Sequence, residues 1–552
     1  MSKTFDAIYV GGHSFTAGQH SSEPQGVAVK DGRIAAVASD DQLREAGATE
    51  VIELNGGLVM PAFHDAHAHP IAAGIELLEC DLTGAENSDE AIQLIKKFAT
   101  SHPDSEWIRG GGWSLAHFPG GTPTKELLDE LEEIGGRPVA ILNRDHHGMW
   151  VNSEALKRAG IDLNTSDPED GRIERKESGE PSGMLHEGAM ELIKSVIPPL
   201  PAQMKDQGLQ IAQQEYFKYG IAGWQDAWVG DMPGIGDNFD AYFEAAVDGR
   251  LQARVTAALW WDRNRGLEQI PELAEKRERV KKLGLDQLLI ADTIKVMVDG
   301  IPENFTAAIS LPYKDQQGCA THNHGLTFLE PEKLTDTVVA LDDAGFNVHF
   351  HSLGDRAVTI SLDAVEAAIA RNGHRDDRRH HLAHLQIVQS SDVPRFVKTG
   401  SWANMQMLWA AVDDQLDELT FPFIDESLVS RHYPFGDLKK AGVKLAAGSD
   451  WPVSTQNPIA AAHVGVNRAA PGNTMDPRLG EAQKLTLADV FTAYTAGSAE
   501  VNGRKSLTGQ LEPGLLADLI VLDRDPFQHP DEEIYLAEVA QLSLSGTQVF
   551  TR

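Results

Sequence analysis

Eight short apolar or β-branched segments, separated by stretches of helical character, constrain the fold of this chain more than any other feature. Strands that alternate with helices are typical of a parallel sheet with crossover helices, and eight is the number of strands that closes a (β/α)8 barrel. The candidate strands are residues 58–67, 220–226, 251–260, 291–298, 346–351, 380–385, 401–406 and 443–449. We therefore predict an α/β protein built on a TIM-like barrel.

The two ends of the chain have a different character. Both carry short strand-like segments, and turn signals such as Asp31-Gly32 interrupt the first of them. We predict one small β-sandwich domain made of residues 1–58 and 500–552, flanking the barrel at 59–499. Residues 70–219 are too many for a simple crossover after the first barrel strand. Because barrel active sites lie at the carboxyl ends of the strands, we expect this insertion to form a lid subdomain over the barrel mouth.

The composition limits the classes of partner. The 552 residues include 48 Lys and Arg and 82 Asp and Glu, which gives a formal net charge of −34. This charge repels phosphate backbones and anionic lipids, so neither a nucleic acid nor a membrane is an expected partner. Only two cysteines, Cys80 and Cys319, are present, which fits a reducing compartment. No export signal or bilayer-length apolar stretch is seen, so we expect a cytoplasmic protein, and a homodimer stays open.

A pair of histidines lies at the end of the first predicted barrel strand, in the sequence Phe63-His64-Asp65-Ala66-His67-Ala68-His69. Successive side chains of a strand point to opposite faces, so His67 and His69 share a face and can bind one metal ion together. A His-Ala-His pair is also common on protein surfaces, so the pair alone does not settle the matter.

Four further residues lie at the carboxyl ends of other predicted strands: Lys295, His351, His384 and Asp450. Each has a structural alternative when taken alone, such as a core histidine, an ion-paired lysine or a helix-capping aspartate. Imidazole and carboxylate donors together suit zinc or a similar divalent ion. Six such residues in this order therefore indicate a metal centre.

At this point the chain resembles the amidohydrolase superfamily, and within it the N-substituted formamide deformylase and YtcJ-like branch, amidohydrolase family 3. The resemblance runs from about residue 5 to about 527, and the segments that carry it are residues 65–70, 111–113, 147–153, 171–173 through 181–183, 295–300, 351–357, 448–452 and 511–518.

The resemblance implies a role for each candidate ligand. His67 and His69 would bind the more buried ion, and His351 and His384 the more exposed one. Asp450 would bind the buried ion and the nucleophilic water. Lys295 would be carboxylated to a carbamate that bridges two divalent ions, most simply two Zn²⁺. Binding of a single metal ion is the alternative.

Hydrolysis by such a centre follows ordinary chemistry. Two divalent ions lower the pKa of a bridging water from about 15.7 toward 7, which supplies hydroxide at neutral pH. Asp450 would accept the proton and pass it to the leaving nitrogen. His147 is our candidate for binding substrate and stabilising the oxyanion, with a structural loop histidine as the alternative. Trp113 either lines the substrate pocket or packs, and His64 and His349 are expected to be structural.

The preferred function is a metal-dependent hydrolase that cleaves the carbon-nitrogen bond of a linear amide of the N-acyl or N-formyl amine type. Two alternatives stay open. One is a deaminase or an imidazolonepropionase-like cyclic amidohydrolase on the same fold, against which Lys295 argues. The other is a non-catalytic regulatory relative, against which the complete set of six candidate ligands argues. The identity of the substrate is not indicated.

Overall fold

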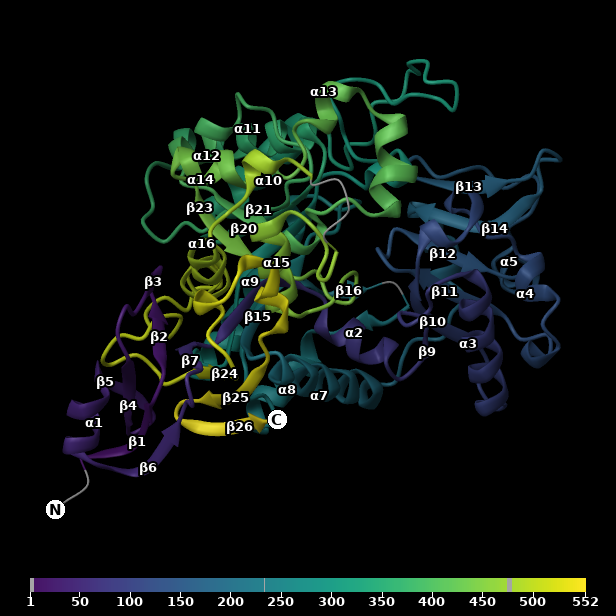
Figure 1. Cartoon of the computed structure of the whole chain (residues 1–552). Coiled ribbons are helices and arrows are strands. Elements are labelled where there is room, and N and C mark those ends of the chain that lie inside the picture. The colour runs from purple at the N-terminus through teal and green to yellow at the C-terminus, as the bar shows by residue number, and fades with distance from the viewer. Residues whose placement is uncertain (1–3, 233, 474–478) are drawn as a thin grey trace.

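Eight parallel strands form the centre of the protein, which is a computed structural model that describes residues 4–232, 234–473 and 479–552 (Figure 1). Neighbouring strands pair in parallel from the first strand to the eighth, in chain order. The predicted α/β barrel is confirmed. Its strands are β8 (Phe63–Ala68), β15 (Ile221–Val229), β18 (Arg254–Trp260), β19 (Leu289–Met297), β20 (Asn347–Ser352), β21 (His381–His384), β22 (Trp402–Met405) and β23 (Lys444–Ala447).

Side-chain contacts and the loop after β23 join the last barrel strand to the first. The backbone N–H of Asp450 donates to the carbonyl of His67 at 2.8 Å. The Asp65 carboxylate accepts from the backbone N–H of Ser449 at 3.0 Å and from its hydroxyl at 2.5 Å. Asp65 is fully buried, so these bonds form in a dry interior where they are strong. They close the barrel at the place where the predicted ligands of the two strands meet.

Helices surround the strands and bury their outer faces, as expected for alternating strand and helix patterns. Apolar side chains of helices and strands share one large core that also includes Tyr216 and Phe350. The helices of the barrel layer are α7 (Ala202–Lys218), α8 (Phe239–Val247), α9 (Ile270–Lys282), α10 (Pro331–Asp343), α11 (Asp355–Asn372), α12 (Val393–Thr399), α14 (Phe435–Ala441) and α15 (Pro458–Asn467).

The first predicted strand, residues 58–67, is two strands in the structure. β7 (Leu58–Pro61) pairs with β24 (Leu519–Leu522) and β2 (His13–Thr16), and only β8 joins the barrel. The backbone changes sheet at Ala62, directly after Pro61, which has no N–H to continue a ladder. One continuous apolar run therefore serves two sheets, and its alternation gives no sign of the change.

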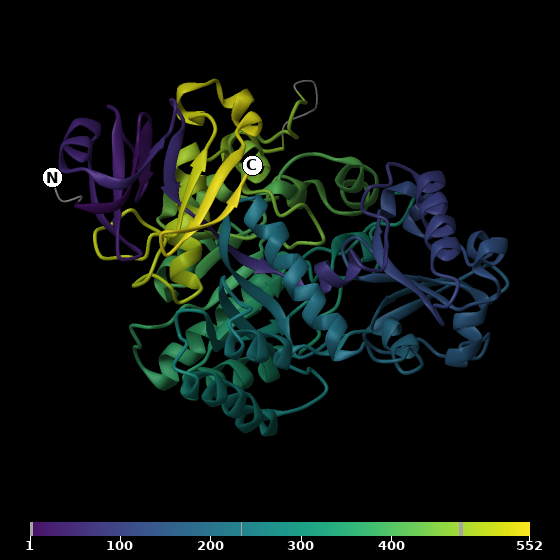
Figure 2. The same cartoon turned by 90° about the horizontal axis from the view of Figure 1, so that it is seen from below.

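The terminal segments form two sheets that share a core including Tyr9, Val27, Val59 and Leu519. In Figure 2 the purple N-terminal strands and the yellow C-terminal strands lie side by side. One sheet has β1 (Phe5–Val10), β4 (Gln25–Lys30), β5 (Arg33–Ser39) and β6 (Ala48–Glu53). The other has β2, β3 (Gln19–His20), β7, β24, β25 (Val539–Leu544) and β26 (Thr547–Thr551).

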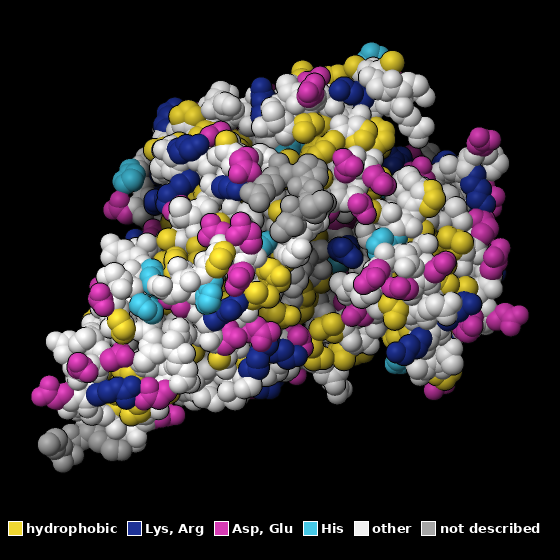
Figure 3. Space-filling view, viewed as in Figure 1, with side chains coloured by type: hydrophobic (Ala, Val, Ile, Leu, Met, Phe, Trp, Pro, Cys, Tyr) yellow, Lys and Arg dark blue, Asp and Glu magenta, His cyan; other side chains and the backbone are white. Residues whose placement is uncertain are grey.

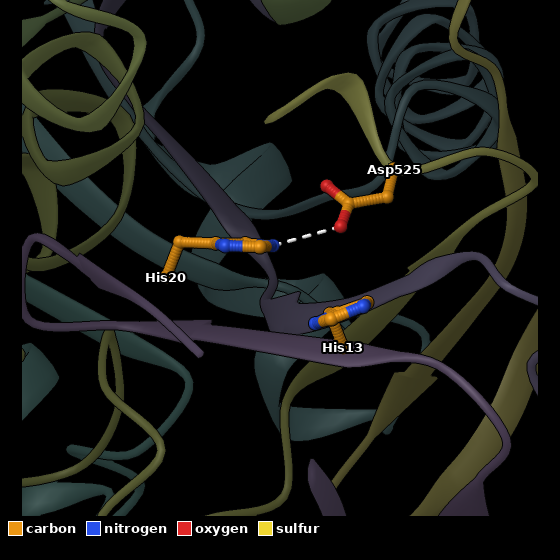
Figure 4. Close-up of side chains that lie close together, drawn as sticks. All are labelled: His13, His20 and Asp525. Carbon is orange, nitrogen blue, oxygen red and sulfur yellow. Dashed lines mark hydrogen bonds and ion pairs between the residues drawn. The ribbon is translucent and has the colours of Figure 1, made fainter. Parts of the chain in front are cut away.

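A polar contact ties the β2–β3 hairpin to the C-terminal segment (Figure 4). The His20 ring lies 2.7 Å from the buried Asp525 carboxylate through Nε2, and it stacks between His13 and Phe527. Asp525 also accepts from the backbone N–H of Phe527. The contact joins residues that are far apart in the chain.

Within the expected insertion at 70–219, a separate six-stranded sheet spans residues 80–187, while α2 (Pro70–Glu76) and α7 pack on the barrel core (Figure 1). The sheet contains β9 (Cys80–Asp81), β10 (Ile108–Trp113), β11 (Val139–Asn143), β12 (Gly148–Val151), β13 (Gly171–Arg175) and β14 (Pro181–Glu187). Its helices are α3 (Ser88–Ser101), α4 (Glu126–Asp129), α5 (Ser153–Ala159) and α6 (Glu191–Lys194).

On the face in Figure 3, Asp and Glu side chains are spread over all parts of the molecule, with Lys and Arg between them. No helix in the described part of the chain has the length and apolarity needed to cross a membrane.

Candidate metal centre and active site

All six predicted metal ligands line a single cavity of about 970 Å³. The insertion contributes Asp145, His146, His147 and Glu187 to the same cavity. The cavity therefore lies between the insertion and the barrel. The six residues come from the ends of five barrel strands or the turns that follow them: His67 on β8 and His69 just after it, Lys295 on β19, His351 on β20, His384 on β21 and Asp450 after β23.

Distances at the centre fit a metal ion. The Nε2 atoms of His67 and His69 each lie 3.2 Å from Oδ1 of Asp450. Two ligands bound to zinc at 2.0–2.1 Å in a tetrahedron lie about 3.3 Å apart. Donor atoms of His67, His384 and Asp450 all lie within 4.8 Å of one another.

The hydrogen bonding at the centre supports the same interpretation. Asp450 Oδ1, both ring nitrogens of His384 and Nδ1 of His351 are buried and have no hydrogen-bond partner within the described residues. Buried polar atoms without partners are costly, and a cation would compensate several of them at once. These residues therefore fit a divalent metal.

One other group of candidate ligands exists among the described residues, His13, His20 and Asp525. Its His20 nitrogen lies only 2.7 Å from the Asp525 oxygen, which is a hydrogen-bond distance and too short for two ligands of one ion. We interpret it as the structural contact described above.

The backbone is strained at several residues of the cavity. His384 has a φ of 76° and Asp450 a φ of 56°, both in the left-handed region. From the insertion, His146 at 63° and Glu187 at 51° share this feature. Such conformations of non-glycine residues cost on the order of 1–3 kcal/mol each and are concentrated at functional sites.

Burial and charge set the protonation of the two central residues. Burial lowers the pKa of Lys295 to about 7, so much of its amine is uncharged at neutral pH. Burial alone would raise the pKa of Asp450, but the neighbouring His67, His69 and His384 hold it well below its usual range. The centre thus contains a carboxylate and an amine able to act as a nucleophile.

His147 is held by an ion pair from the insertion. Its Nδ1 lies 2.8 Å from Oε2 of Glu187, whose Oε1 accepts from the hydroxyl of Thr306 at 2.7 Å. Burial lowers the pKa of His147, but Glu187 outweighs it and raises the pKa to about 9. His147 is therefore protonated at neutral pH, with its ring centroid 5.4 Å from that of His351.

The structure does not bring Trp113 to the cavity. Its indole is fully buried in the core of the insertion, where it packs on Phe118 and Trp150 and donates to the carbonyl of Ile141 at 3.1 Å. This placement corresponds to the packing alternative rather than to a substrate-binding wall. The reason is that β10 directs Trp113 into the sheet's own apolar core, which sequence alternation did not distinguish from the cavity.

Other side chains form the walls of the cavity. Trp228 and Trp260 stack with ring centroids 3.8 Å apart, and the Arg263 guanidinium lies 4.1 Å from the centre of the Phe328 ring. His64 is fully buried and is not among the residues of the cavity.

Sequence reasoning missed several polar residues around the centre. Asp299 lies behind His351, with Oδ1 3.5 Å from Nδ1, and accepts backbone N–H bonds from Leu353, Gly354 and Ala308. Its position in the segment 295–300 was a usable signal. Glu187 carried no such signal, because it is the last residue of β14 in the insertion and is distant in sequence from every candidate ligand.

Gly448 offers a direct test of the packing at the centre. A Cβ at this position would lie 2.6 Å from the backbone nitrogen of His67 and 2.8 Å from its Cβ. We expect Gly448→Ala to lower the free energy of unfolding by about 1–3 kcal/mol, as overpacking does, and to weaken metal binding by displacing His67. Denaturant unfolding and metal analysis would measure both. Gly84→Ala is the control, because no atom lies within 4 Å of its added Cβ; equal effects of the two changes would contradict the prediction.

Comparison with known proteins agrees with this geometry. A sequence model described as the amidohydrolase family matches residues 50–550. The chain is 27% identical to a putative amidohydrolase, YtcJ, of Bacillus subtilis, over 99% of both chains. It is 26% identical to an N-substituted formamide deformylase of Arthrobacter pascens, over 100% of this chain and 99% of that protein. Among solved structures, an uncharacterised metal-dependent hydrolase from Pyrococcus horikoshii has the same fold, with a TM-score of 0.71 and 24% identity over 95% of this chain and 99% of that one.

Proposed function

The chain belongs to the amidohydrolase family, in its YtcJ-like branch, and from this premise we propose that it hydrolyses the carbon-nitrogen bond of a linear amide of the N-acyl or N-formyl amine type. The family shows that the protein is a metal-dependent hydrolase, and what we propose is the class of its substrate, a linear amide. The observation that carries it is the convergence of His67, His69, Lys295, His351, His384 and Asp450 on one cavity, with several unpartnered donor atoms.

We propose that these six residues would hold two divalent ions, most simply Zn²⁺, and that Lys295 would serve both ions as the carbamate that forms when its uncharged amine adds carbon dioxide and releases a proton. The uncharged amine that carboxylation needs is supported by the pKa of Lys295, which burial lowers to about 7. A single ion is the alternative. When bound, the metal supplies Lewis-acid activation of water and polarises the substrate carbonyl.

Asp450 is the proposed proton carrier. Its pKa lies well below the usual range, so it is ionised and able to accept the proton that water loses on attack. It then donates this proton to the leaving nitrogen, because an amine leaves poorly as an anion. Its backbone N–H donates to the carbonyl of His67, which fixes its position across the barrel seam.

His147 is the proposed donor to the oxyanion. Because Glu187 binds Nδ1, the protonated Nε2 is the nitrogen left to donate. A charged donor placed in advance where negative charge develops stabilises the transition state, and removing one such donor costs about 10²–10³ in kcat. Glu187 and the hydroxyl of Thr306 orient the ring.

The proposal is tested by a substrate screen on metal-loaded protein. N-formyl and N-acyl amines of increasing size are compared with cyclic amides and with aminated heterocycles, and release of amine, ring-opened product or ammonia is measured. We expect turnover of the linear amides alone. Turnover of only the cyclic amides or the heterocycles would support the alternative reaction, and no turnover in any class would support a non-catalytic role.

The pH dependence of the reaction tests His147. Its pKa of about 9 is above the ordinary value, so the protonated form predominates below pH 9 and is lost above it. We expect kcat/KM to fall above about pH 9, and Glu187→Gln to move this alkaline limb to lower pH because the partner that raises the pKa is gone. His147→Gln should lower kcat by about 10²–10³-fold. An alkaline limb that stays in place in Glu187→Gln would argue against this role.

A further inference from the structure

A continuous line of hydrogen bonds runs through the barrel interior behind His67. Nδ1 of His67 lies 2.7 Å from Nε2 of His349, and Nδ1 of His349 lies 2.7 Å from Oε1 of Gln225. Nε2 of Gln225 donates to Oδ1 of Asn502 at 3.0 Å, and Nδ2 of Asn502 donates to the backbone carbonyl of Asp65 at 3.1 Å. The four side chains in this line are at most 1% exposed. Water therefore has little access to the line, and its hydrogen bonds depend on one another.

The backbone carbonyl of Asp65 fixes the direction of every bond in the line. A carbonyl only accepts, so the Asn502 atom that faces it is the amide nitrogen, and the Asn502 oxygen faces Gln225. Gln225 must then present its nitrogen to Asn502 and its oxygen to His349. His349 consequently carries its hydrogen on Nδ1 and has a lone pair on Nε2, which accepts from Nδ1 of His67.

We propose that His349, Gln225 and Asn502 are positioning residues that hold His67 in its Nδ1–H tautomer, so that the lone pair of Nε2 points at the metal centre. The inference rests on the proposed function, in which His67 is a metal ligand. It gives His349 a defined role: both ring nitrogens are engaged in the line, so it is neither a ligand nor a passive core residue.

The geometry at the centre agrees with this assignment. Nε2 of His67 lies 3.2 Å from Oδ1 of Asp450, and that oxygen has no hydrogen-bond partner within the described part of the chain. Two facing lone pairs repel unless a cation lies between them. In the opposite tautomer, Nε2 would carry a hydrogen and could not bind a metal.

The members of the line come from distant parts of the sequence. Gln225 is on β15, His349 is on β20, and Asn502 follows α17 (Ser498–Val501) at its C-terminal end. Hydrogen-bond partners of metal-binding histidines fix the tautomer and ring orientation, and their loss lowers metal affinity by about 10–100-fold. A comparable effect is expected here from residues that touch no metal.

Gln225→Met breaks the line without altering either histidine. We expect the full-length variant to bind Zn²⁺ about 10–100-fold more weakly than wild type in competition with a chelator. Gln225→Glu should restore affinity close to wild type, because a neutral carboxyl group donates to Asn502 and accepts from His349 as the amide does. His381→Gln is the matched control: His381 is equally buried, its ring centroid lies 4.1 Å from that of His349, and it is outside the line.

A second measurement separates this inference from the proposed function. Nitrogen-15 shifts of the histidine rings in the metal-free protein report the tautomers directly; we expect the Nδ1–H form for His67 and His349 in wild type and mixed forms in Gln225→Met. Unchanged affinity and shifts in Gln225→Met, or equal losses in Gln225→Met and His381→Gln, would overturn the inference. A wild-type protein with the expected shifts but no affinity for divalent ions would instead overturn the proposed function.

Discussion

Asp450→Asn is expected to abolish turnover, with kcat falling by about 10⁴-fold or more. The amide keeps the shape of the side chain but cannot accept the proton released by water, and general base catalysis alone contributes about 10²–10⁴-fold. It also removes the negative charge that the three surrounding imidazoles favour, as the depressed pKa of Asp450 indicates. Steady-state kinetics on an N-formyl or N-acyl amine, with metal analysis of the same samples, would measure the effect.

Asp226→Asn is the matched control for this variant. Asp226 is also a buried carboxylate on a barrel strand, where it accepts from the Tyr242 hydroxyl at 2.7 Å and the Trp228 backbone N–H at 2.9 Å, but it does not line the cavity. We expect a much smaller loss of kcat. If Asp450→Asn retained most of the activity, or if both variants lost it equally, Asp450 would not be the proton carrier.

The barrel and the convergence of the six candidate ligands on one cavity were predictable because each signal is local. A buried parallel strand shows as a short apolar run, and a candidate ligand lies at its carboxyl end, as His351 does after Val348 and Phe350. Eight such strands, each followed by a helix, close into a barrel and allow few other folds. The sequence order of the candidate ligands then indicates which strands contribute to the centre.

Features that depend on distant contacts were not predictable in the same way. The division between β7 and β8 depends on pairing with β24, more than 450 residues later in the chain. Trp113 is the last residue of β10 in the small sheet of the insertion, so its alternation pattern is the same whether it faces a core or a cavity. Glu187 and Asn502 act through contacts with His147 and Gln225, and no spacing in the sequence marks such partners.

The role of His349 follows from the strand pattern in the sequence together with the hydrogen bonds in the structure. Sequence parity places it on the same side of β20 as His351, which allowed a ligand or a structural residue. Only the hydrogen bonds to His67 and Gln225 distinguish these possibilities, because they occupy both ring nitrogens. Alternation along a strand thus gives the face on which a side chain lies. The position of that side chain along the barrel axis decides which groups it contacts.

Lys295→Ala is expected to remove turnover together with part of the bound metal. Metal-loaded wild type should contain about two divalent ions per chain on the two-metal scheme, and the variant should lose at least the ion that depends most on the bridge. The physical reason is charge: an ammonium among two cations is repelled, whereas a carbamate places an anion between them. Metal analysis and kinetics on the same preparation, with bicarbonate present and absent, would measure both quantities.

Lys295→Glu is the control that separates charge from packing. Lys295 is 1% exposed, so alanine also leaves a cavity, and a loss of stability could imitate a loss of bridging. Glutamate returns a carboxylate to the same strand position and should recover metal content, and with it part of the turnover. Unchanged hydrolysis and metal content in Lys295→Ala would exclude the bridge, and loss of metal in both variants would indicate that packing around β19, rather than an anion at this position, maintains the centre.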